Sequence, residues 1–445
     1  MGLLCILIFE VLTMERIYTA DIKEHLGERV RLVGWLHRLR RLSHVTFLIL
    51  RDAKGLAQVV VEDATLVAKL AELHNETVLW VEGGVRAEAQ APGGVEVHEP
   101  VIQVIAPSHP PPLDIFRPAI KAPLPTILDF APLTLRHPRH RALFHLASAS
   151  MQGFRSTLRE MGFVEIQTPK IVGTATEGGA NVFSLDYFGK PAYLAQSPQF
   201  YKQTMVGVFE RVFEVGPVFR AEPHDTPRHL NEYVSLDAEM GFIQDHTTVM
   251  ACLTRVIMGM VEAIRVEAGE AVSLLGLTLP EVLSSIPSVH FADAQEMIAR
   301  ETGEDVIGEP DLAPSHERWL SEWARREYGS DFLFVTGFPM VKRPFYTHPD
   351  PHKPGYSNSF DLLFRGLELV TGGQRLHLYE DYLAALGARQ LSPEGLESYL
   401  DAFKYGMPPH GGFAIGLERW VARLIEAANI RETTLFPRDM HRLAP

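Results

Sequence analysis

The sequence predicts an α+β fold, in which a small β-barrel precedes a larger unit of antiparallel strands flanked by helices. Three observations support this prediction. The first hundred residues contain short apolar runs that alternate as strands do. A proline-rich stretch follows over residues 107–135. Beyond it, helical periodicity such as that of residues 140–161 is interspersed with strand-like pairs, which is typical of an α+β domain.

Residues 14–106 are predicted to form the barrel. Five short strands with one helix are typical of a Greek-key barrel of the OB type, which binds single-stranded nucleic acid on its open face. Phe47 lies beside an arginine-rich segment and could stack on a base, although an aromatic residue in such a strand is more often core. The predicted strands are Arg29–Trp35, Thr46–Arg51, Leu56–Val61, Thr77–Glu82 and Val95–Val97, and the helix is Asp63–Leu73.

Composition indicates a protein of two domains with locally concentrated positive charge. The chain has 445 residues and a net charge of -13, from 42 basic and 55 acidic side chains. Six arginines and no acidic residue lie between Arg29 and Arg51. Such a cationic face can hold a phosphate backbone on an acidic protein, because screening limits the field to about 10 Å. Only two cysteines occur, Cys5 and Cys252, which excludes a disulfide framework and suits a reducing cytoplasm.

Two segments are expected to lie outside the packed domains. Residues 1–13 are apolar but too short to span a bilayer, and they lack the basic lead and cleavage site of a signal peptide. We therefore expect an extension that is not part of the fold, and no membrane association. Residues 107–135 contain eight prolines, which lack amide donors and fix φ, so we expect an extended linker.

The segment Phe219–Met240 is the most informative part of the chain. It opens on Phe-Arg-Ala-Glu, continues through a polar loop with Arg228 and His229, and closes in an alternating run. A similar run at Arg211–Gly216 precedes it, so the pattern predicts two strands joined by a long mobile loop. Arginines grip phosphates through paired planar donors, and such a loop can close over a nucleotide. A charged hairpin without a ligand is the alternative.

Two later segments complement this one. Residues 358–371 alternate as paired strands and lead into Gly372-Gly373-Gln374-Arg375. Within them, Glu368 and Thr371 supply the carboxylate and hydroxyl oxygens that Mg²⁺ prefers. Residues 411–419 form a glycine-rich strand and turn before a predicted helix, 417–428, and glycine permits close approach of an adenine. The sequence contains no P-loop, Rossmann or zinc-protease motif.

The segment Phe219–Met240 resembles the second of three signature motifs of the class II aminoacyl-tRNA synthetases, in the short archaeal-type form of the aspartyl and asparaginyl branch. Gly162–Pro169 is similar to the first motif, and Gly411–Arg419 to the third. The resemblance covers nearly the whole chain after Met14. It implies an OB-fold anticodon-binding domain, a class II catalytic domain at about 136–445, and a homodimer built on the first motif.

The resemblance implies a reaction in two steps with ATP and Mg²⁺. The α-carboxylate of L-aspartate attacks the α-phosphorus, and the resulting adenylate passes its acyl group to the terminal ribose of tRNA(Asp). The implied catalytic residues are Arg220, Glu368 and Arg419, and the implied metal ligands are Glu368 and Thr371, where the family usually has Ser at the second position. The residues implied at ATP are Arg220, Ala221, Glu222, Arg228, His229, Leu230, Tyr233, Glu368, Gly416, Leu417, Glu418 and Arg419.

The resemblance also implies an aspartate pocket. Glu177, in the loop Thr174–Gly179, would hold the substrate ammonium. Lys202 stands where aspartyl enzymes carry a lysine and asparaginyl enzymes do not, and Arg375 matches the arginine that clamps the side-chain carboxylate. The implied aspartate-binding residues are Glu177, Gln196, Ser197, Pro198, Gln199, Lys202, Arg220, Thr371 and Arg375.

In the barrel, the resemblance places Phe47, Gln58 and, as a weaker match, Glu96 at the anticodon. His37 and Pro92 resemble the residues of relaxed members that also charge tRNA(Asn), making Asp-tRNA(Asn) for a separate amidotransferase. The alternative for His37 is an ordinary polar residue on a basic barrel face.

Three other functions share part of this pattern. An asparaginyl-tRNA synthetase has the same three motifs and a different amino-acid pocket. A tRNA-independent asparagine synthetase of related fold would lack the barrel. A non-catalytic RNA-binding paralogue would have lost motif arginines, whereas this chain keeps Arg220, Arg228 and Arg419.

Overall fold

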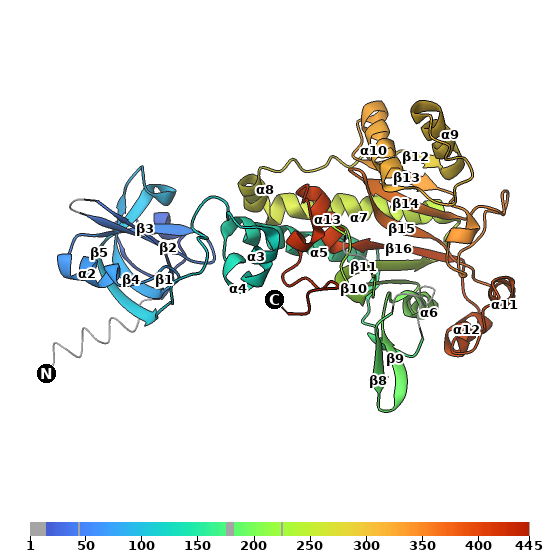
Figure 1. Cartoon of the computed structure of the whole chain (residues 1–445), viewed down its shortest axis with the longest axis horizontal. Helices are drawn as coiled ribbons and strands as arrows, with labels where there is room; N and C mark the ends of the chain where they lie inside the picture. Colours follow the sequence, from blue (N-terminus) through green and yellow to red (C-terminus); the bar gives the residue numbers. More distant parts are fainter. Residues whose placement is uncertain (1–14, 43–44, 175–181, 224–225, 445) are drawn as a thin grey trace. The chain divides into compact units, whose positions relative to one another are not determined.

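The structure is a computed structural model that describes residues 15–42, 45–174, 182–223 and 226–444. The predicted extension, residues 1–13, and the predicted ammonium-binding residue Glu177 lie outside the described residues. Figure 1 shows the order of the helices and strands.

The chain divides into two compact units. The first unit consists of the chain up to Pro123 together with the short segment Pro132–His137. The second unit consists of Leu124–Ala131 and the chain from Pro138 onward.

The first unit contains a closed five-stranded barrel of strand order β1-β2-β3-β5-β4. Neighbouring strands are antiparallel except β3 and β5, which are parallel. The predicted OB barrel is therefore confirmed. Its elements are η1 (Ile22–His25), β1 (Arg29–Arg41), β2 (Thr46–Arg51), β3 (Leu56–Val61), α2 (Ala64–Ala71), β4 (Val78–Ala87), η2 (Pro92–Gly94) and β5 (Val95–Ala106).

Buried side chains alternate with more exposed ones along β1 and β4, whereas β2 and β3 are buried along nearly their whole length, and together these strands build the barrel core. Leu32, Leu48, Val59 and Val81 are buried in one cluster. Gly34 permits a tight strand crossing, since a Cβ atom there would lie 2.3 Å from the carbonyl oxygen of Arg51. The barrel thus closes through sequence features of its strands: apolar alternation and a glycine at the close contact.

The second unit contains an eight-stranded sheet of order β12-β13-β14-β15-β16-β11-β10-β6. The sheet is antiparallel except at its two ends, where β12 pairs with β13 and β6 pairs with β10 in parallel. A separate three-stranded sheet has the order β7-β9-β8. The strands are β6 (Val164–Glu165), β7 (Ile171–Val172), β8 (Ser184–Tyr187), β9 (Lys190–Leu194), β10 (Arg211–Phe219), β11 (Glu232–Gly241), β12 (Ser288–His290), β13 (Phe332–Thr336), β14 (Ser359–Phe364), β15 (Leu367–Gln374) and β16 (His410–Gly416).

Helices flank this sheet, as predicted. They are α3 (Leu124–Asp129), α5 (Pro138–Glu160), α6 (Gln199–Phe209), α7 (His246–Glu267), α8 (Gly269–Leu275), α9 (Phe291–Thr302), α10 (Pro314–Tyr328), α11 (Tyr379–Ala388), α12 (Glu397–Lys404) and α13 (Leu417–Leu424), with short η3 (Met340–Lys342) and η4 (Ile430–Thr433).

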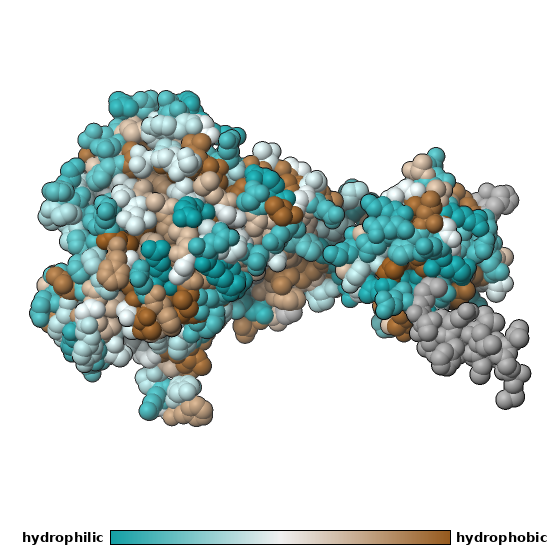
Figure 2. Space-filling view, turned by 180° about the vertical axis from the view of Figure 1, so that it is seen from behind, coloured by the Kyte–Doolittle hydropathy of each residue, from teal (hydrophilic) through white to brown (hydrophobic). Residues whose placement is uncertain are grey.

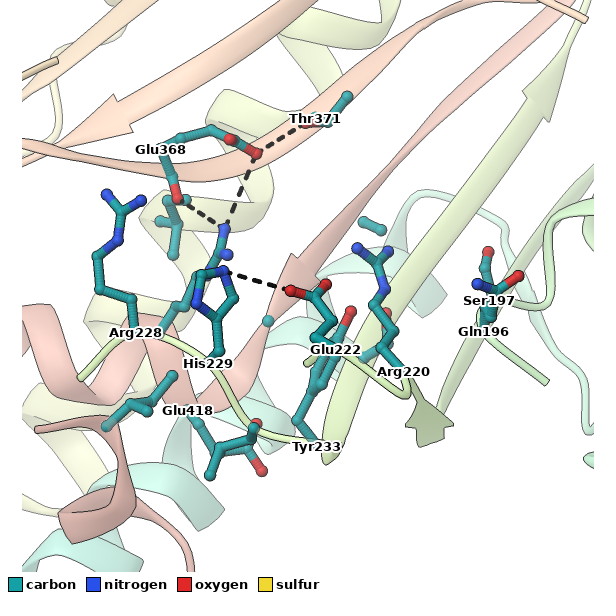
Figure 3. A pocket seen from close by; sticks show the side chains of 17 residues that line it. Gln196, Ser197, Arg220, Glu222, Arg228, His229, Tyr233, Glu368, Thr371 and Glu418 are labelled. Atoms are coloured by element: carbon teal, nitrogen blue, oxygen red, sulfur yellow. Dashed lines mark hydrogen bonds and ion pairs between the residues drawn. The ribbon is translucent and has the colours of Figure 1, made fainter. Parts of the chain in front are cut away.

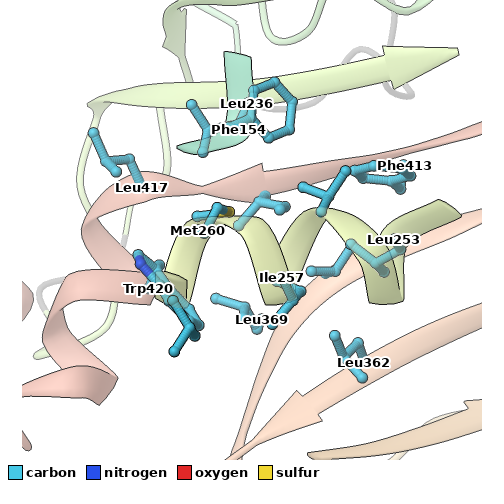
Figure 4. Close-up of a cluster of buried hydrophobic side chains, with 14 of the residues drawn as sticks. Phe154, Leu236, Leu253, Ile257, Met260, Leu362, Leu369, Phe413, Leu417 and Trp420 are labelled. Carbon is cyan, nitrogen blue, oxygen red and sulfur yellow. The ribbon is translucent and has the colours of Figure 1, made fainter. Parts of the chain in front are cut away.

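The main core lies between the sheet and helices α5 and α7. Figure 4 shows Ile257 and Met260 of α7 among apolar side chains of the sheet, with Trp420 of α13 nearby. The Trp420 indole donates to the Ser150 hydroxyl of α5 at 2.9 Å, which satisfies its buried N–H. The core therefore fixes the strands that carry the predicted site residues.

The expected linker differs from its prediction. Residues 124–129 form α3, and residues 131–134 form α4 (Ala131–Thr134). Pro125 and Pro132 occupy the second positions of these helices, where the missing amide proton costs no intrahelical bond. Proline density alone therefore misjudged this segment. No helix in the described part of the chain is long and apolar enough to cross a membrane.

Candidate active site

A pocket opens along strands β11, β15 and β16 of the large sheet, with an empty volume of about 810 Å³ that includes space open to solvent. It is lined by Gln196, Ser197, Arg220, Glu222, Arg228, His229, Leu230, Tyr233, Ser235, Glu368, Leu369, Thr371, Ala414, Gly416, Glu418, Arg419 and Ile430. In Figure 3, Gln196 and Ser197 lie at one end, Arg228 and Glu368 at the other, and Arg220 between. Most of the predicted ATP-site residues therefore share one pocket, while Ala221 and Leu417 do not line it.

The loop between β10 and β11 forms one wall of this pocket. The two strands stay paired to Phe219 and Glu232. Immediately beyond, the Arg220 amide donates to Asn231 O at 2.9 Å, and the Asn231 side chain donates to Arg220 O at 2.7 Å. These bonds fix the main chain of Arg220 at the base of the loop, and Glu222, Arg228, His229 and Leu230 of the loop line the pocket. Residues 224–225 lie outside the described residues.

One end of the pocket gathers arginines around a carboxylate. Arg419 Nη1 lies 3.2 Å from the main-chain oxygen of Glu368 and 3.9 Å from its Oε1. The Thr371 hydroxyl donates to the same Oε1 at 2.9 Å. Burial disfavours the charged form, but Arg419 and Thr371 outweigh it and hold the pKa of Glu368 below its ordinary value. Glu368 is therefore an anion held among cations.

Glu368 and Thr371 fit a magnesium site by their chemistry. Asp361 lies on β14 directly across from Thr371. Burial raises the pKa of Asp361 to about 7, with the charge of Glu368 acting in the same direction. A divalent cation would relieve this crowding of carboxylates. No cluster of three or more His, Cys, Asp or Glu side chains arranged to hold a metal occurs within the described ranges, and Mg²⁺ commonly takes one or two carboxylates, completed by phosphates and water.

Tyr233 and Glu418 form another part of the pocket. The Arg220 guanidinium carbon lies 5.9 Å from the centroid of the Tyr233 ring. Both carboxylate oxygens of Glu418 accept from the Val234 amide at 3.1 Å. Burial raises the pKa of Glu418 to about 7. His229 Nε2 lies 3.5 Å from Glu222, so these two predicted residues pair with each other in this structure.

Lys202 and Arg375 lie beneath the pocket and not on its lining. They are only 1% and 7% exposed. Lys202 Nζ lies 3.0 Å from Asp237 and 3.3 Å from Glu239, and Arg375 Nε donates to Glu239 at 3.0 Å. The Ser235 hydroxyl, which does line the pocket, donates to Asp237 at 2.5 Å. The two predicted cations thus converge on Glu239, and Ser235 and Asp237 connect them to the pocket floor.

A neutral hydrogen-bond network packs beside this charged group. The Gln203 amide donates to Tyr382 Oη at 3.1 Å and contacts His410 Nε2 at 3.0 Å, while Tyr399 Oη donates to Gln203 at 3.0 Å. Burial lowers the pKa of His410 to about 4. His410 is therefore neutral, with Nδ1 donating to Pro408 O and Nε2 free to accept from Gln203.

Of the other residues predicted to bind the substrate aspartate, some line the pocket and others lie behind its lining. Gln196 and Ser197 line the pocket, whereas Pro198 and Gln199 do not. Gln199 is buried and donates to Gln203 at 3.1 Å, so its side chain supports α6 from within. At Gly412 the main chain passes so close to Glu239 that a Cβ atom there would lie 2.1 Å from a carboxylate oxygen of Glu239.

In the barrel, two of the predicted anticodon residues lie together. Gln58 on β3 donates to Glu96 on β5 at 2.8 Å, and the strands pair in parallel at these positions. Phe47 is half-buried beneath Arg40, whose guanidinium carbon lies 5.9 Å from the ring centroid. His37 instead meets Phe116 edge to face at 5.3 Å, and Pro92 is exposed in η2. No hydrogen bond within the described barrel joins His37 or Pro92 to the other three.

Sequence reasoning missed several residues of this site. Asp237 and Glu239 occur inside the segment that resembles the second motif, and their alternation with buried apolar residues was the available signal. The same kind of signal was available for Asp361 on β14, which lies between the apolar residues Phe360 and Leu362. Glu317 comes from α10, in a region whose sequence shows only helical periodicity, and nothing local marked it.

Comparisons with known proteins agree with this geometry. The family described as tRNA synthetases class II (D, K and N) matches residues 124–440, and an OB-fold nucleic acid binding domain matches residues 30–105. The chain is 47% identical over 438 residues to the aspartate–tRNA(Asp/Asn) ligase of Deinococcus radiodurans, covering 97% of this chain and 99% of that protein. It is 46% identical over 431 residues to the ligase of the same name from Thermus thermophilus, covering 97% and 100%.

Among solved structures, the chain is similar to the asparaginyl-tRNA synthetase of Pyrococcus horikoshii complexed with asparaginyl-adenylate. The TM-score is 0.91 at 32% sequence identity, covering 97% of this chain and 100% of that one. The family match spans the sheet, the pocket and the three motif segments. This chain therefore belongs to the class II aminoacyl-tRNA synthetases.

Proposed function

We propose that this enzyme attaches L-aspartate to tRNA(Asp) through an aspartyl-adenylate made from ATP. The observation that carries the choice of aspartate is the buried pair of cations, Lys202 and Arg375, which share Glu239 and which Asp237 connects to Ser235 of the pocket lining. A guanidinium and an ammonium together recognise a carboxylate better than a neutral amide. The relatives named aspartate–tRNA(Asp/Asn) ligase, at 46–47% identity over nearly the full length, support the same choice.

In this proposal the residues act by position and charge. Arg220, at the centre of the pocket, bridges the aspartate α-carboxylate and the α-phosphate, so that the two reacting groups approach in line. Arg228 and Arg419, at the end near Glu368, hold the outer phosphates that leave as pyrophosphate. The Tyr233 ring stacks on adenine. No protein nucleophile is needed, because the substrate carboxylate itself attacks.

We also propose that Glu368 and Thr371 hold Mg²⁺. Bound there, the ion neutralises negative charge on the phosphates. The protein's part is to keep the Glu368 carboxylate ionised, through Arg419 and the Thr371 hydroxyl, and to orient it toward the phosphate end of the pocket.

A second proposal concerns the range of tRNA. We propose that the enzyme also charges tRNA(Asn), and that a separate amidotransferase converts the product. The supporting observations are His37 and Pro92, together with the names of the relatives. Comparing kcat/KM for the two transcripts tests this. A preference for tRNA(Asp) beyond about a hundredfold, the upper reach of one base contact, would mark a strict enzyme.

We further propose that the protein forms a homodimer and acts in the cytoplasm. A chain with only two cysteines, which excludes a disulfide framework, suits that reducing compartment. The sheet ends at β6, where Val164 is 41% exposed, and the small sheet also carries exposed apolar side chains: Ile171 on β7, at 48%, and Phe188 in the turn between β8 and β9, at 91%. Figure 2 shows apolar surface on the larger unit next to the projecting β8–β9 hairpin. Light scattering at micromolar concentration tests the dimer, and a monomer would contradict it.

The asparaginyl enzyme remains the alternative that a specific observation favours, namely the TM-score of 0.91 to an asparaginyl-tRNA synthetase. The alternative without enzymatic activity is a tRNA-binding paralogue. ATP–pyrophosphate exchange separates all three. We expect exchange that depends on aspartate. Exchange driven equally by asparagine would overturn the amino-acid choice, and no exchange with either would favour the binding protein.

A further inference from the structure

Glu317 brings a carboxylate to the phosphate end of the pocket from outside the three motifs. It lies on α10, and its side chain is 10% exposed. Its Oε2 atom accepts from the Glu368 amide at 2.9 Å and lies 3.9 Å from Arg228 Nη1. One oxygen thus faces both the strand that carries Glu368 and the loop that carries Arg228.

The support beneath Glu317 is rigid. Helix α10 buries Leu320 and Ala324 in a cluster shared with β13. At its start, the Ala313 amide donates to His316 Nδ1 at 3.1 Å, and His316 Nε2 lies 3.0 Å from Glu304. A side chain carried on such a helix is held more accurately than one carried on a loop.

Arg228, by contrast, belongs to the loop between β10 and β11, and its side chain is 39% exposed. A long, exposed side chain loses conformational freedom when it binds a phosphate, and a nearby fixed carboxylate reduces that loss by restricting it beforehand. The negative charge of Glu317 can therefore restrict the Arg228 side chain, in addition to the hydrogen bond that Glu317 accepts from the Glu368 amide.

We propose that Glu317 is a positioning residue that orients Arg228 for the outer phosphates of ATP. This inference rests on the proposed function, in which Arg228 grips those phosphates. It predicts a selective effect: the loss of the Glu317 charge weakens ligands that carry β- and γ-phosphates, and spares a ligand that has only the α-phosphate or its mimic.

A purely structural role makes a different prediction. If Glu317 only supports β15 through the Glu368 amide, then disturbing it weakens every ligand of the pocket alike. Glu317→Gln separates the two roles, because the new side-chain carbonyl still accepts from that amide while the charge is lost. Glu322→Gln is the matched control, since Glu322 is an exposed glutamate on the same helix.

The experiment measures binding of ATP and of a non-hydrolysable aspartyl-adenylate analogue by calorimetry. The proteins are the full-length wild type, Glu317→Gln, Glu322→Gln, Arg228→Ala and the double variant Glu317→Gln/Arg228→Ala. We expect Glu317→Gln to weaken ATP about tenfold, which corresponds to 1.4 kcal/mol, while the analogue changes less than about twofold. Adding Glu317→Gln to Arg228→Ala should change ATP binding little further.

Equal ATP affinity for the wild type and Glu317→Gln would overturn the inference. Equal weakening of ATP and the analogue would also overturn it, because that result marks a structural role. A wild type that binds the analogue but not ATP would overturn this inference and the proposed ATP site together, whereas failure of Glu317→Gln alone to show the effect leaves the proposed function standing.

Discussion

The Nε atom of Arg375 lies 3.0 Å from Oε1 of Glu239, and both side chains are buried in the floor beneath the candidate active site. Lys202 Nζ lies 3.3 Å from the other oxygen of the same carboxylate. The two cations that are expected to recognise the substrate carboxylate are therefore held in place by protein carboxylates in this structure. Despite its complete burial, the pKa of Glu239 is below its ordinary value, because Arg375 and Lys202 stabilise the anion.

This arrangement predicts a large loss of stability for Glu239→Gln. Removing one partner of a buried ionic group leaves the others uncompensated, which costs on the order of 3–5 kcal/mol. Urea unfolding of the variant and the wild type measures it. Glu262→Gln is the control, because Glu262 forms an exposed pair with Arg265, and we expect a change within about 0.5 kcal/mol there. Similar effects at the two sites would contradict this view of Glu239.

Lys202→Met should impair use of aspartate more than use of ATP. The unbranched Met side chain fills similar space, but it leaves Asp237 and Glu239 with one cation fewer. We expect the KM for aspartate to rise at least about tenfold, since a site that pairs buried polar groups depends strongly on each partner. The dissociation constant of ATP should change less than about twofold. A variant with an unchanged KM for aspartate would remove Lys202 from substrate selection.

Arg220→Ala should abolish adenylate formation while the fold and tRNA binding persist. Arg220 lines the pocket. Its main-chain N–H and C=O groups are hydrogen-bonded to Asn231, and the substitution retains these bonds because it changes only the side chain. Loss of one donor aimed at reacting charge costs about a hundredfold or more in rate. Pyrophosphate exchange measures the loss, and a tRNA filter-binding assay measures what is kept. Near-normal exchange would exclude Arg220 from the mechanism.

Glu418→Gln should change how stability depends on pH. Burial raises the pKa of Glu418 to about 7 from an ordinary value of 4.5. Between these pH values the folded state keeps a proton that the unfolded chain releases. The contribution of Glu418 is therefore fully present below pH 4.5 and is lost as pH rises through 7.

The size of this effect is about 3–4 kcal/mol, because the pKa of Glu418 rises from 4.5 to about 7 and each step of one in pKa corresponds to about 1.4 kcal/mol. The stability difference between wild type and Glu418→Gln, measured by urea unfolding from pH 4.5 to 7.5, should fall by that order. The substituted side chain keeps an amide oxygen that can still accept from the Val234 amide, so the fold is preserved. A difference that is flat across this range would show that Glu418 is ionised in the folded protein.

The fold was largely predictable because its signals are local. Apolar alternation predicted the barrel strands, and helical periodicity predicted α5 within two residues at its start and one at its end. The helices at 124–134 were missed because proline suggested extension, whereas a proline in the first turn is compatible with a helix.

The site was predictable as a set of residues and not as an arrangement. Motif order brought Arg220, Glu368 and Arg419 to one pocket, as the structure has them. That Lys202 and Arg375 are buried against Glu239, and that Glu317 reaches Arg228 from α10, depends on contacts between segments distant in the sequence. Such contacts leave no periodic signal in a single chain.

Aminoacylation of tRNA(Asp) with labelled aspartate or labelled asparagine tests the central claim most directly. With ATP and Mg²⁺ present, we expect aspartate to be attached and asparagine to be used at least about 10⁴-fold less efficiently, the discrimination that buried polar complementarity can supply. Attachment of asparagine to tRNA(Asn), with no attachment of aspartate to either tRNA, would contradict the account.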